Sequence, residues 1–474
     1  MNEDEVFSPE LLHVYYGKDS KLASHTSNLT FFMLLCFQNG CFHMNCLRNG
    51  SRMMAVIPAS YCFVNMLNRF PGEEYLRRRE FSFTLENGTY IRYKTFQNDQ
   101  EFRNAMLKQL PSKVDIGAVF SISPADKGKV NPNEFIAEQR ELVFDIDLTD
   151  YDDTRTCCRE ASTCSRCWSF MIAAVKVLNY ALREDFGFKH ILWVYSGRRG
   201  VHCWVADDKA RVLTNEARTS IVHYLSLVEG NEHSKRKVHL RYPLHPSLHR
   251  ANEILEPLFY EIVLSENGQD ILHHQKEYNK LLDMIPDEDI RNALAEKWRT
   301  PLAESQSPKA KWDDVQNAVQ TALVNKGQNN KRTYTAYSED SERKKNLQQL
   351  KGCLQEIVCS YLYPRLDVNV SKQRNHLLKS PFAVHPKTGR ICVPIDPETI
   401  EEFNPANAPT LALLQEELNG NKTSDSDSKS ILNHTSLQYH IEFFERKFLK
   451  PLLLASKAKE REGRESSAAF TGDW

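Results

Sequence analysis

Two carboxylates separated by one residue are the first side chains in this sequence that could do chemistry. Asp145 and Asp147 lie in residues 141–150, where apolar and polar residues alternate as in a half-buried strand. Side chains two positions apart on a strand point the same way and lie about 6–7 Å apart, so this pair could chelate one or two divalent cations. Such a pair is the metal platform of phosphoryl and nucleotidyl transfer. An isolated Asp-x-Asp is more often the exposed end of a strand, so the neighbouring motifs must decide.

Four cysteines follow the carboxylates within one short segment, with the spacing CC-x5-C-x2-C: Cys157, Cys158, Cys164 and Cys167. The chain has no secretory signal pattern, so we expect a reducing compartment and an all-thiolate zinc site rather than disulfides. Adjacent cysteines are unusual zinc ligands, which leaves a reactive or partly vacant site as an alternative. An amphipathic helix is predicted directly after the cluster, so we expect a structural zinc that fixes a loop beside the carboxylates.

A glycine-rich basic turn joins two predicted strands within residues 190–205. Val201, Cys203 and Val205 share the apolar side of the second strand, which places His202 on the opposite side. The polar side chains of the turn could surround an anion, because glycines let backbone N–H groups approach phosphate and guanidinium groups donate forked hydrogen bonds. Such a turn alone is more often a solvated hairpin. After a paired-carboxylate strand, it predicts a triphosphate-binding cradle.

A similar alternation recurs in residues 365–371, which we predict to be a further strand. Its apolar residues face one way and Asp367 and Asn369 the other, so Asp367 is the natural third carboxylate. Residues 372–390 combine basic residues and histidines and contain no acid. We expect this tract to form a second phosphate-binding wall.

Together these motifs resemble the small, catalytic subunit of eukaryotic DNA primase, in the archaeo-eukaryotic primase superfamily. The matching strings are ELVFDIDLTDYDD, the cysteine cluster, FGFKHILWVYSGRRGVHCWV and YPRLDVNVSKQRNHLLKSPFAVHPKTGRICVPID, in family order, over most of residues 75–405. The resemblance implies Asp145, Asp147 and Asp367 as catalytic carboxylates that bind Mg²⁺ or Mn²⁺, with Glu80 as a further catalytic residue. It implies a structural Zn²⁺ on Cys157, Cys158, Cys164 and Cys167. The implied nucleotide-binding residues are Arg92, Ser196, Gly197, Arg198, Arg199, Gly200, Val201, His202, His376, Leu377, Leu378, Lys379 and His385.

The function implied by the resemblance is that of a nucleotidyltransferase in DNA replication. It would be a DNA-directed RNA polymerase that makes short RNA primers de novo on single-stranded DNA from ribonucleoside triphosphates, by two-metal catalysis. The implied partners are the large primase subunit and, through it, the DNA polymerase alpha complex of the primosome, in the nucleus. Two alternatives stay open: a primase-polymerase of the same superfamily for lesion bypass or repriming, whose zinc module usually lies C-terminal, and a zinc-stabilised nucleic-acid-binding scaffold without activity. Intact carboxylates argue against the scaffold.

Composition sets the outer limits. The 474 residues are 41% hydrophobic and 26% charged, as in soluble globular proteins, and are enough for a large core. The net charge of −1 gives no global basic field, so attraction to DNA must come from local basic tracts, metals or a partner. The apolar run at residues 29–37 is too short to cross a bilayer, and we expect no membrane anchor.

The predicted fold class is α/β, of the α+β type: a mixed-sheet catalytic core with an inserted helical subdomain and a small zinc-binding motif. Residues 80–94 predict a hairpin around Asn87-Gly88, followed by a helix at 101–110, a strand at 114–121 with Asp115 exposed, and a loop at 124–133. Helical periodicity marks 216–228, 276–284, 287–298, 312–324 and 343–361, with a mobile loop at 326–343. Further helices are predicted at 4–16, 436–448 and 452–462, the last two interrupted at Pro451, with a frayed tail to Trp474.

The predicted domain order has seven parts. They are an N-terminal helix at 1–17, an atypical insertion at 18–70, the first part of the catalytic core at 71–207 with the zinc motif at 157–167, a helical subdomain at 208–360, the second part of the core at 361–410, a disordered linker at 411–435 and a C-terminal helical tail at 436–474. Residues 18–70 show neither helical periodicity nor alternation, and their cysteines lack a zinc spacing. We interpret this insertion as a translated non-coding stretch or a mispredicted exon rather than a new functional module.

Overall fold

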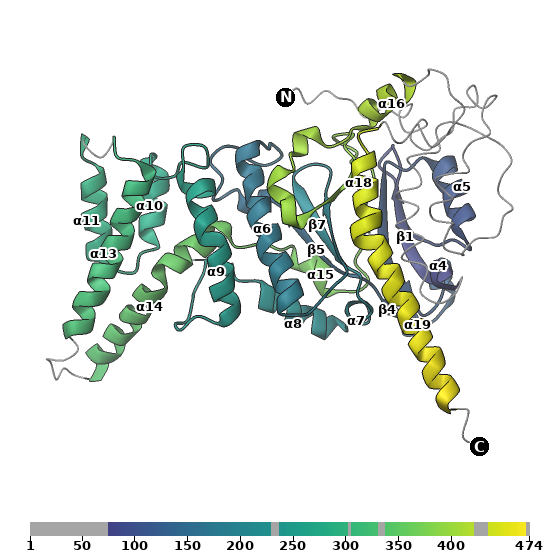
Figure 1. The fold of residues 1–474 in the computed structure, drawn as a ribbon, viewed down its shortest axis with the longest axis horizontal. Coiled ribbons are helices and arrows are strands. Elements are labelled where there is room, and N and C mark those ends of the chain that lie inside the picture. The colour runs from purple at the N-terminus through teal and green to yellow at the C-terminus, as the bar shows by residue number, and fades with distance from the viewer. Residues whose placement is uncertain (1–73, 229–236, 302–304, 330–336, 421–434, 471–474) are drawn as a thin grey trace. The chain divides into compact units, whose positions relative to one another are not determined.

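The computed structural model describes residues 74–228, 237–301, 305–329, 337–420 and 435–470 (Figure 1). The chain divides into two compact units, each built from separate stretches of sequence. The first, which we call the sheet unit, comprises Met1–Asp145, Phe188–Thr219 and Val368–Trp474. The second, the helical unit, comprises Ile146–Gly187 and Ser220–Asp367. The predicted helix at 4–16 and the insertion at 18–70 lie outside the described residues.

The first sheet of the sheet unit has the order β2-β1-β3-β4, with β8 also paired to β3. Its strands are β1 (Arg79–Thr84), β2 (Tyr90–Lys94), β3 (Lys113–Phe120), β4 (Ala137–Gln139) and β8 (Leu378–Lys379). The predicted hairpin is confirmed: Gly88 has a φ of +80°, which favours glycine, in the turn between β1 and β2. The predicted helix after it is α5 (Asp99–Gln109), which Asn98 caps by accepting from the Glu101 N–H. Helix α4 (Glu74–Arg78) precedes β1.

Two expectations near β3 are wrong. Asp115 is buried rather than exposed, because Ser82 donates a hydrogen bond to it at 3.0 Å and Lys113 forms an ion pair with it at 2.9 Å. Ser82 lies on the neighbouring strand β1, and Lys113 lies two residues before Asp115. The alternation of polar and apolar residues could not reveal that these partners would stabilise a buried carboxylate. The predicted loop at 124–133 contains the 3-10 helix η2 (Pro124–Lys129), which begins with a proline whose φ suits a helix start.

The second sheet has the order β5-β7-β6-β9. Its strands are β5 (Leu142–Asp147), β7 (Gly200–Val205), β6 (Ile191–Tyr195) and β9 (Pro394–Ile395). Strands β6 and β7 form the predicted hairpin, and all their side chains are buried, so both faces of this part of the sheet are covered. The helices and antiparallel strand pairs confirm the predicted mixed fold class.

A buried charge cluster holds the start of β5. Arg79 and Arg211 both lie against the Glu141 carboxylate, and all three side chains are almost fully buried. Burial alone would raise the pKa of Glu141, but these two arginines lower it to about 2. Arg218 donates to the backbone carbonyls of Glu141, at 3.1 Å, and of Arg140. The strand that leads to Asp145 is therefore fixed at its first residues by charge-assisted hydrogen bonds.

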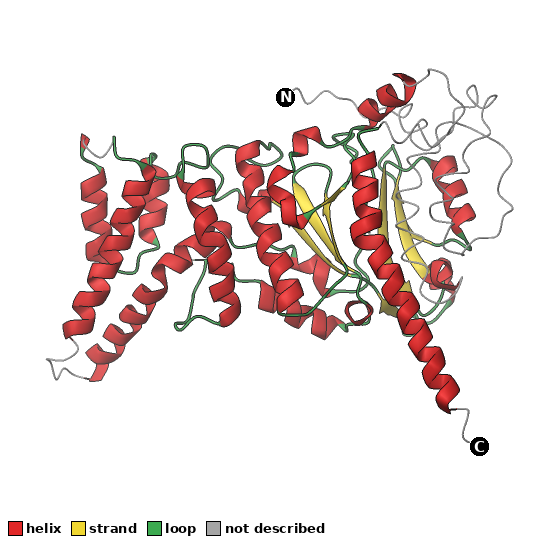
Figure 2. Cartoon of the chain, viewed as in Figure 1, coloured by secondary structure: helices red, strands yellow, loops and turns green. Residues whose placement is uncertain are grey.

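The helical unit consists almost entirely of helices, and Figure 2 shows no strand among α9 to α14. It contains η3 (Leu148–Tyr151), α6 (Ser165–Glu184), α9 (Pro246–Phe259), the π-helix η4 (Tyr260–Leu264), α10 (Gln275–Asp283), α11 (Glu288–Trp298), α13 (Pro308–Asn329) and α14 (Tyr337–Leu362). The short helix α7 (Asp208–Arg211) belongs to the sheet unit, and α8 (Asn215–Leu225) crosses the division between the units. The five predicted helices of this region are confirmed with shifted ends.

Helix α9 was not predicted, because Pro257 inside it removes a backbone donor and breaks the helical pattern. The mobile loop predicted at 326–343 is wrong at both ends, since α13 continues to Asn329 and α14 begins at Tyr337. Lysine, glutamine, glutamate and arginine are good helix formers as well as solvent-exposed residues. A polar composition is therefore as compatible with an exposed helix as with a loop, and it misled the prediction there. Residues 330–336 lie outside the described part of the chain.

The strand predicted at 365–371 is also wrong. Asp367 precedes a short helix, α15 (Val368–Lys372), although valines favour strands. Arg365 is fixed in place, because its guanidinium donates to the carbonyls of Asp150, at 2.6 Å, and Ser360, at 3.0 Å. Tertiary contacts thus set the local path, and an aspartate just before a helix is a favourable start.

The C-terminal region is more helical than expected. Helix α16 (Leu411–Gly420) occupies the first part of the predicted linker, and residues 421–434 lie outside the described range. Helix α18 (Gln438–Phe443) passes through the π-helix η7 (Phe444–Leu449) into α19 (Lys450–Phe470), so Pro451 does not interrupt it. A π-helical turn is a local widening that can accept a residue without an N–H. In the described part of the chain, no helix has both the length and the apolar composition needed to cross a membrane.

Candidate active site

The carboxylate pair lies on β5 as predicted. Asp145 and Asp147 are half-buried. Phe144, directly before Asp145, and Ile146, between the two aspartates, are buried, which matches the expected alternation. The division of the chain falls directly after Asp145 and directly after Asp367. Asp145 therefore belongs to the sheet unit, whereas Asp147 and Asp367 belong to the helical unit.

Asp145 has a histidine beside it in the sheet unit. The Nε2 atom of His202, on β7, lies 3.6 Å from Oδ1 of Asp145. Burial and the nearby Lys379 and Lys113 lower the pKa of His202 to about 3. The imidazole is therefore neutral near pH 7, and the contact is not an ion pair.

Asp147 and Asp367 contribute to a concentration of negative charge in the helical unit. Oδ1 of Asp147 accepts hydrogen bonds from the Thr149 N–H at 2.9 Å and the Thr149 hydroxyl at 2.8 Å, so it caps η3. Partial burial, Asp147 and Asp367 raise the pKa of Asp150 to about 6, although Arg365 opposes them. Mutually repelling carboxylates supply the hard oxygen ligands that Mg²⁺ and Mn²⁺ prefer, so this donor set fits a divalent cation. Sequence reasoning did not assign Asp150 a role, although it is a further acid in the quoted motif.

The two predicted phosphate-binding stretches lie together in the sheet unit. Lys379, on β8, donates to the carbonyl of Ser196 at 3.0 Å, and Thr388 donates to the carbonyl of Gly197 at 2.7 Å. Gly197 has a φ of +89°, and a Cβ there would lie 2.6 Å from Cβ of His385. Glycine is therefore required at this turn for both its backbone conformation and its close packing.

The cradle formed by these stretches is electropositive. Burial lowers the pKa of His385 to about 2, with further contributions from Lys379, Arg198, Arg199 and His202. The positive groups that face this imidazole add to the effect of burial and make its protonation still less favourable. Their common field is what an anion such as a triphosphate would neutralise.

Glu80 and Arg92 form a pair at the edge of the first sheet. Glu80 is fully buried, and its carboxylate accepts from Arg92 Nε at 2.9 Å, Arg92 Nη2 at 3.2 Å and the Tyr93 N–H at 3.3 Å. Arg92 also donates to the carbonyl of Asn375 at 3.3 Å. Glu80 thus fixes the direction of the Arg92 guanidinium. The segment after Asn375 leads through the exposed His376 and half-buried Leu377 to β8, where Leu378 pairs with Ile116 and Lys379 with Asp115.

The four cysteines of the helical unit lie within metal-binding reach. Their four sulfur atoms all lie within 4.8 Å of one another. A tetrahedral zinc with Zn–S bonds of about 2.3 Å separates its sulfurs by about 3.8 Å, so the cluster fits Zn²⁺. Cys164 is the N-cap residue of α6. Hydrogen bonds from the Cys157 side chain and the Cys164 N–H, together with the nearby Arg155, lower the pKa of Cys167 to about 5. A side chain from a distant segment anchors this loop, since Gln269 accepts from the Thr156 N–H at 2.7 Å.

Comparison with known proteins agrees with this geometry. The sequence model of a family described as DNA primase small subunit matches residues 144–397, which include all three carboxylates, the cysteine cluster and both cradle stretches. The chain is 43% identical over 350 residues to the DNA primase small subunit of Schizosaccharomyces pombe, covering 73% of this chain and 72% of that protein. It is 36% identical over 422 residues to the Saccharomyces cerevisiae protein of the same name, covering 88% and 95%, and 40% identical over 361 residues to that of Drosophila melanogaster, covering 75% and 76%. The chain therefore belongs to the family of DNA primase small subunits.

Proposed function

We propose that this chain is the catalytic subunit of a DNA primase, which makes short RNA primers de novo on single-stranded DNA from ribonucleoside triphosphates during replication. The observation that carries the proposal is the cradle itself, in which Lys379 donates to the carbonyl of Ser196 and Lys379, Arg198 and Arg199 add to burial in lowering the pKa of His385. A polyanionic triphosphate is the ligand that such a cradle would bind. The primase names of the relatives support the reaction.

The proposed roles follow from the side chains already described. Asp145, Asp147 and Asp367 would hold Mg²⁺ or Mn²⁺, which when bound lowers the pKa of the attacking 3′-hydroxyl and neutralises the triphosphate. Arg198, Arg199 and Lys379 bind the phosphates, and the carbonyl of Ser196 directs the Lys379 ammonium. His202 and His385 stay neutral, so each can donate an N–H without first taking up a proton. Glu80 acts through Arg92, which it directs toward the nucleotide.

The cysteine cluster would hold a structural Zn²⁺ through Cys157, Cys158, Cys164 and Cys167. Its proposed role is to fix the loop between η3 and α6, because the cluster supplies both the cap and the first turn of α6. We further propose that residues 71–207 and 361–410 form the catalytic core and that 208–360 are its helical subdomain. The alternation of the two units along the chain supports such an insertion.

The proposed partners are a large primase subunit, the DNA polymerase alpha complex and a single-stranded DNA template, in the nucleus. The relatives are named as small subunits, which supports a larger partner. A net charge of −1 supports it too, because a chain without a global basic field gains from a partner that helps to hold DNA.

The test is primer synthesis by the full chain from ATP on oligo-dT, with magnesium or manganese. We expect short oligoadenylates, and Arg198→Ala should lower kcat/KM about a hundredfold, because it removes a donor to the triphosphate. Arg446→Ala, at an exposed arginine of the sheet unit, is the matched control. No product from the wild type would favour the inactive scaffold, and long products from deoxynucleotides would favour a primase-polymerase.

A further inference from the structure

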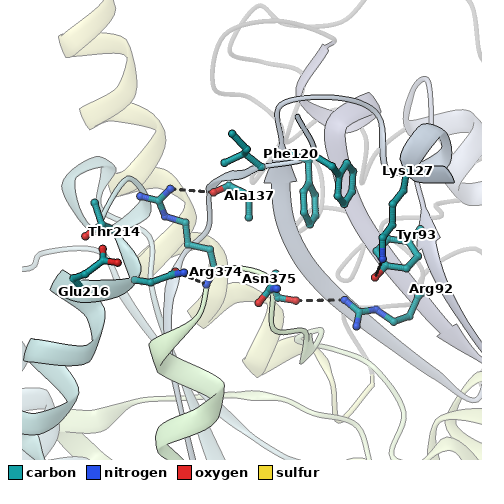
Figure 3. A pocket seen from close by; sticks show the side chains of 12 residues that line it. Arg92, Tyr93, Phe120, Lys127, Ala137, Thr214, Glu216, Arg374 and Asn375 are labelled. Carbon is teal, nitrogen blue, oxygen red and sulfur yellow. Dashed lines mark hydrogen bonds between the residues drawn. The ribbon is translucent and has the colours of Figure 1, made fainter. Parts of the chain in front are cut away.

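A pocket of about 490 Å³ lies within the sheet unit, beside the phosphate-binding wall (Figure 3). Its lining comes from the end of β2, from η2, from residues 135–137, from the start of α8 and from the loop before β8. Arg92 and Asn375, which line it, are joined by the hydrogen bond described above. The pocket is large enough for one nucleotide.

Arg374 holds one side of this pocket in shape. Its guanidinium donates to the carbonyls of Val212 at 2.6 Å, Leu213 at 2.7 Å and Ala137 at 3.0 Å. Figure 3 shows the arginine reaching from the loop before β8 toward Ala137. Its own N–H donates to the Asn215 side chain at 3.1 Å. Segments far apart in the sequence are thus fixed by one residue, which makes the pocket preformed.

The opposite side of the pocket carries aromatic and apolar groups. Phe135 is half-buried and stacks on the buried Phe120, with ring centres 4.1 Å apart and planes 11° apart. Tyr93 approaches Phe135 edge-on, at 6.2 Å between ring centres. Beside them the large apolar side chain of Ile136 is 55% exposed, so it is accessible to a ligand in the pocket.

Positive charge accompanies these rings. Lys127 Nζ lies 3.9 Å from the centre of the Tyr93 ring, and Arg92 Cζ lies 4.9 Å from it. With Arg374, three cations line the pocket, against the single carboxylate of Glu216. Glu80 already pairs with Arg92 at 2.9 Å, and Arg374 donates to backbone carbonyls. Lys127, whose Nζ donates to the Tyr93 hydroxyl, is therefore the cation best placed to meet a phosphate.

We propose that this pocket binds one unpaired nucleotide of the single-stranded DNA template, with its base against Phe135 and Ile136 and its phosphate at Lys127. Aromatic faces next to cations bind single strands without sequence preference, because every base has a π-face and every nucleotide a phosphate. A base within a duplex is stacked on both sides and cannot enter. The inference rests on the proposed function, because it takes the neighbouring cradle to hold the incoming nucleotide.

The test is equilibrium binding of fluorescent oligo-dT to the full chain without nucleotides or divalent cations. Lys127→Ala should reduce the slope of log affinity against log salt by about 0.7, because one phosphate contact is lost. Lys129→Ala, in the same 3-10 helix and outside the pocket lining, should leave the slope unchanged. Phe135→Leu should weaken oligo-dT binding about fivefold or more, and should not weaken binding of an abasic oligomer of equal length.

Equal effects of the two lysine variants, or an equal loss of dT and abasic binding in Phe135→Leu, would overturn the proposal. So would a Phe135→Leu variant that weakens ATP binding rather than oligo-dT binding, because the pocket would then belong to the incoming nucleotide. Thermal melting of each variant checks that it is folded, and Ile136→Ser, at an exposed position, gives a second test of the base contact. Primer synthesis by the wild type is scored separately, so an inactive protein with the expected binding pattern would refute only the proposed function.

Discussion

The two units concentrate opposite charges, and this contrast separates their chemistry. In the sheet unit, burial lowers the pKa of His385 to about 2, and Lys379, Arg198 and Arg199 add to this effect. In the helical unit, burial raises the pKa of Asp150 to about 6, and the carboxylates of Asp147 and Asp367 add to this effect. Burial is the largest cause of both shifts, but like charges add to each of them, and an opposite charge would relieve that repulsion. The cradle of the sheet unit is thus suited to bind phosphate, whereas the acidic residues of the helical unit, together with Asp145 of the sheet unit, are suited to bind cations.

Removing a carboxylate of the helical unit should have the largest effect on activity. Asp367→Ala should leave the fold intact and lower primer synthesis at least about a hundredfold, because the cations that neutralise the triphosphate lose a ligand. Initial rates at saturating magnesium measure the effect, and Asp313→Ala, at an exposed acid of the helical unit, is the control. Near-normal activity of the Asp367 variant would rule out its proposed role.

Removing a zinc ligand should affect stability more than chemistry. Cys164→Ser should lower the zinc content and lower the free energy of unfolding by several kcal/mol, since structural zinc contributes about 10 kcal/mol or more in small zinc domains. Elemental analysis and thermal melting measure these effects. The control is Cys353→Ala, which changes a buried thiol outside the cluster, and this variant should have the same zinc content as the wild type. A wild type purified without zinc would refute the assignment.

The close packing of the cradle predicts a penalty for a single methyl group. Gly197→Ala should lower the free energy of unfolding by about 1–3 kcal/mol and raise the KM for ATP, because the φ of +89° disfavours alanine and the Cβ would meet His385. Denaturant unfolding and steady-state kinetics measure these changes. Gly128→Ala is the control, since a Cβ there has no atom within 4 Å. Equal stability of the two variants would contradict the described packing.

A further prediction concerns the charge state of His385. Its pKa of about 2 keeps it neutral when folded, whereas the unfolded chain protonates it near pH 6.5. The unfolded state then binds more protons, so this residue makes the free energy of unfolding fall by about 1.4 kcal/mol per pH unit as pH drops below 6.5. NMR titration should show no His385 protonation between pH 5 and 8, and a higher pKa in Lys379→Ala. An unchanged pKa in that variant would show that the lysine does not set it.

Local patterns predicted β1, β2, β3, β5, β6 and β7 but not the short strands β4, β8 and β9, and tertiary contacts explain where prediction failed. The alternation around Asp145 and the Asn87-Gly88 turn depend on neighbours in the sequence, and both are confirmed. Asp367 was assigned to a strand because its valine neighbours favour one, but Arg365 directs the chain into α15. Arg374 was predicted within a phosphate-binding wall, but its guanidinium donates to backbone carbonyls that lie far away in the sequence. Pairing of distant segments is what single-sequence patterns cannot show.

Oδ1 of Asp147 accepts hydrogen bonds from both the N–H and the hydroxyl of Thr149, so substituting Asp147 changes the local backbone contacts as well as the charge. The residue serves as a helix cap as well as a proposed cation ligand, so Asp147→Ala would remove both and confuse a local conformational defect with a chemical one. Asparagine keeps an acceptor oxygen for the N–H groups of the first turn and removes only the negative charge. Comparing the two substitutions separates the electrostatic contribution of this side chain from its contribution to the backbone.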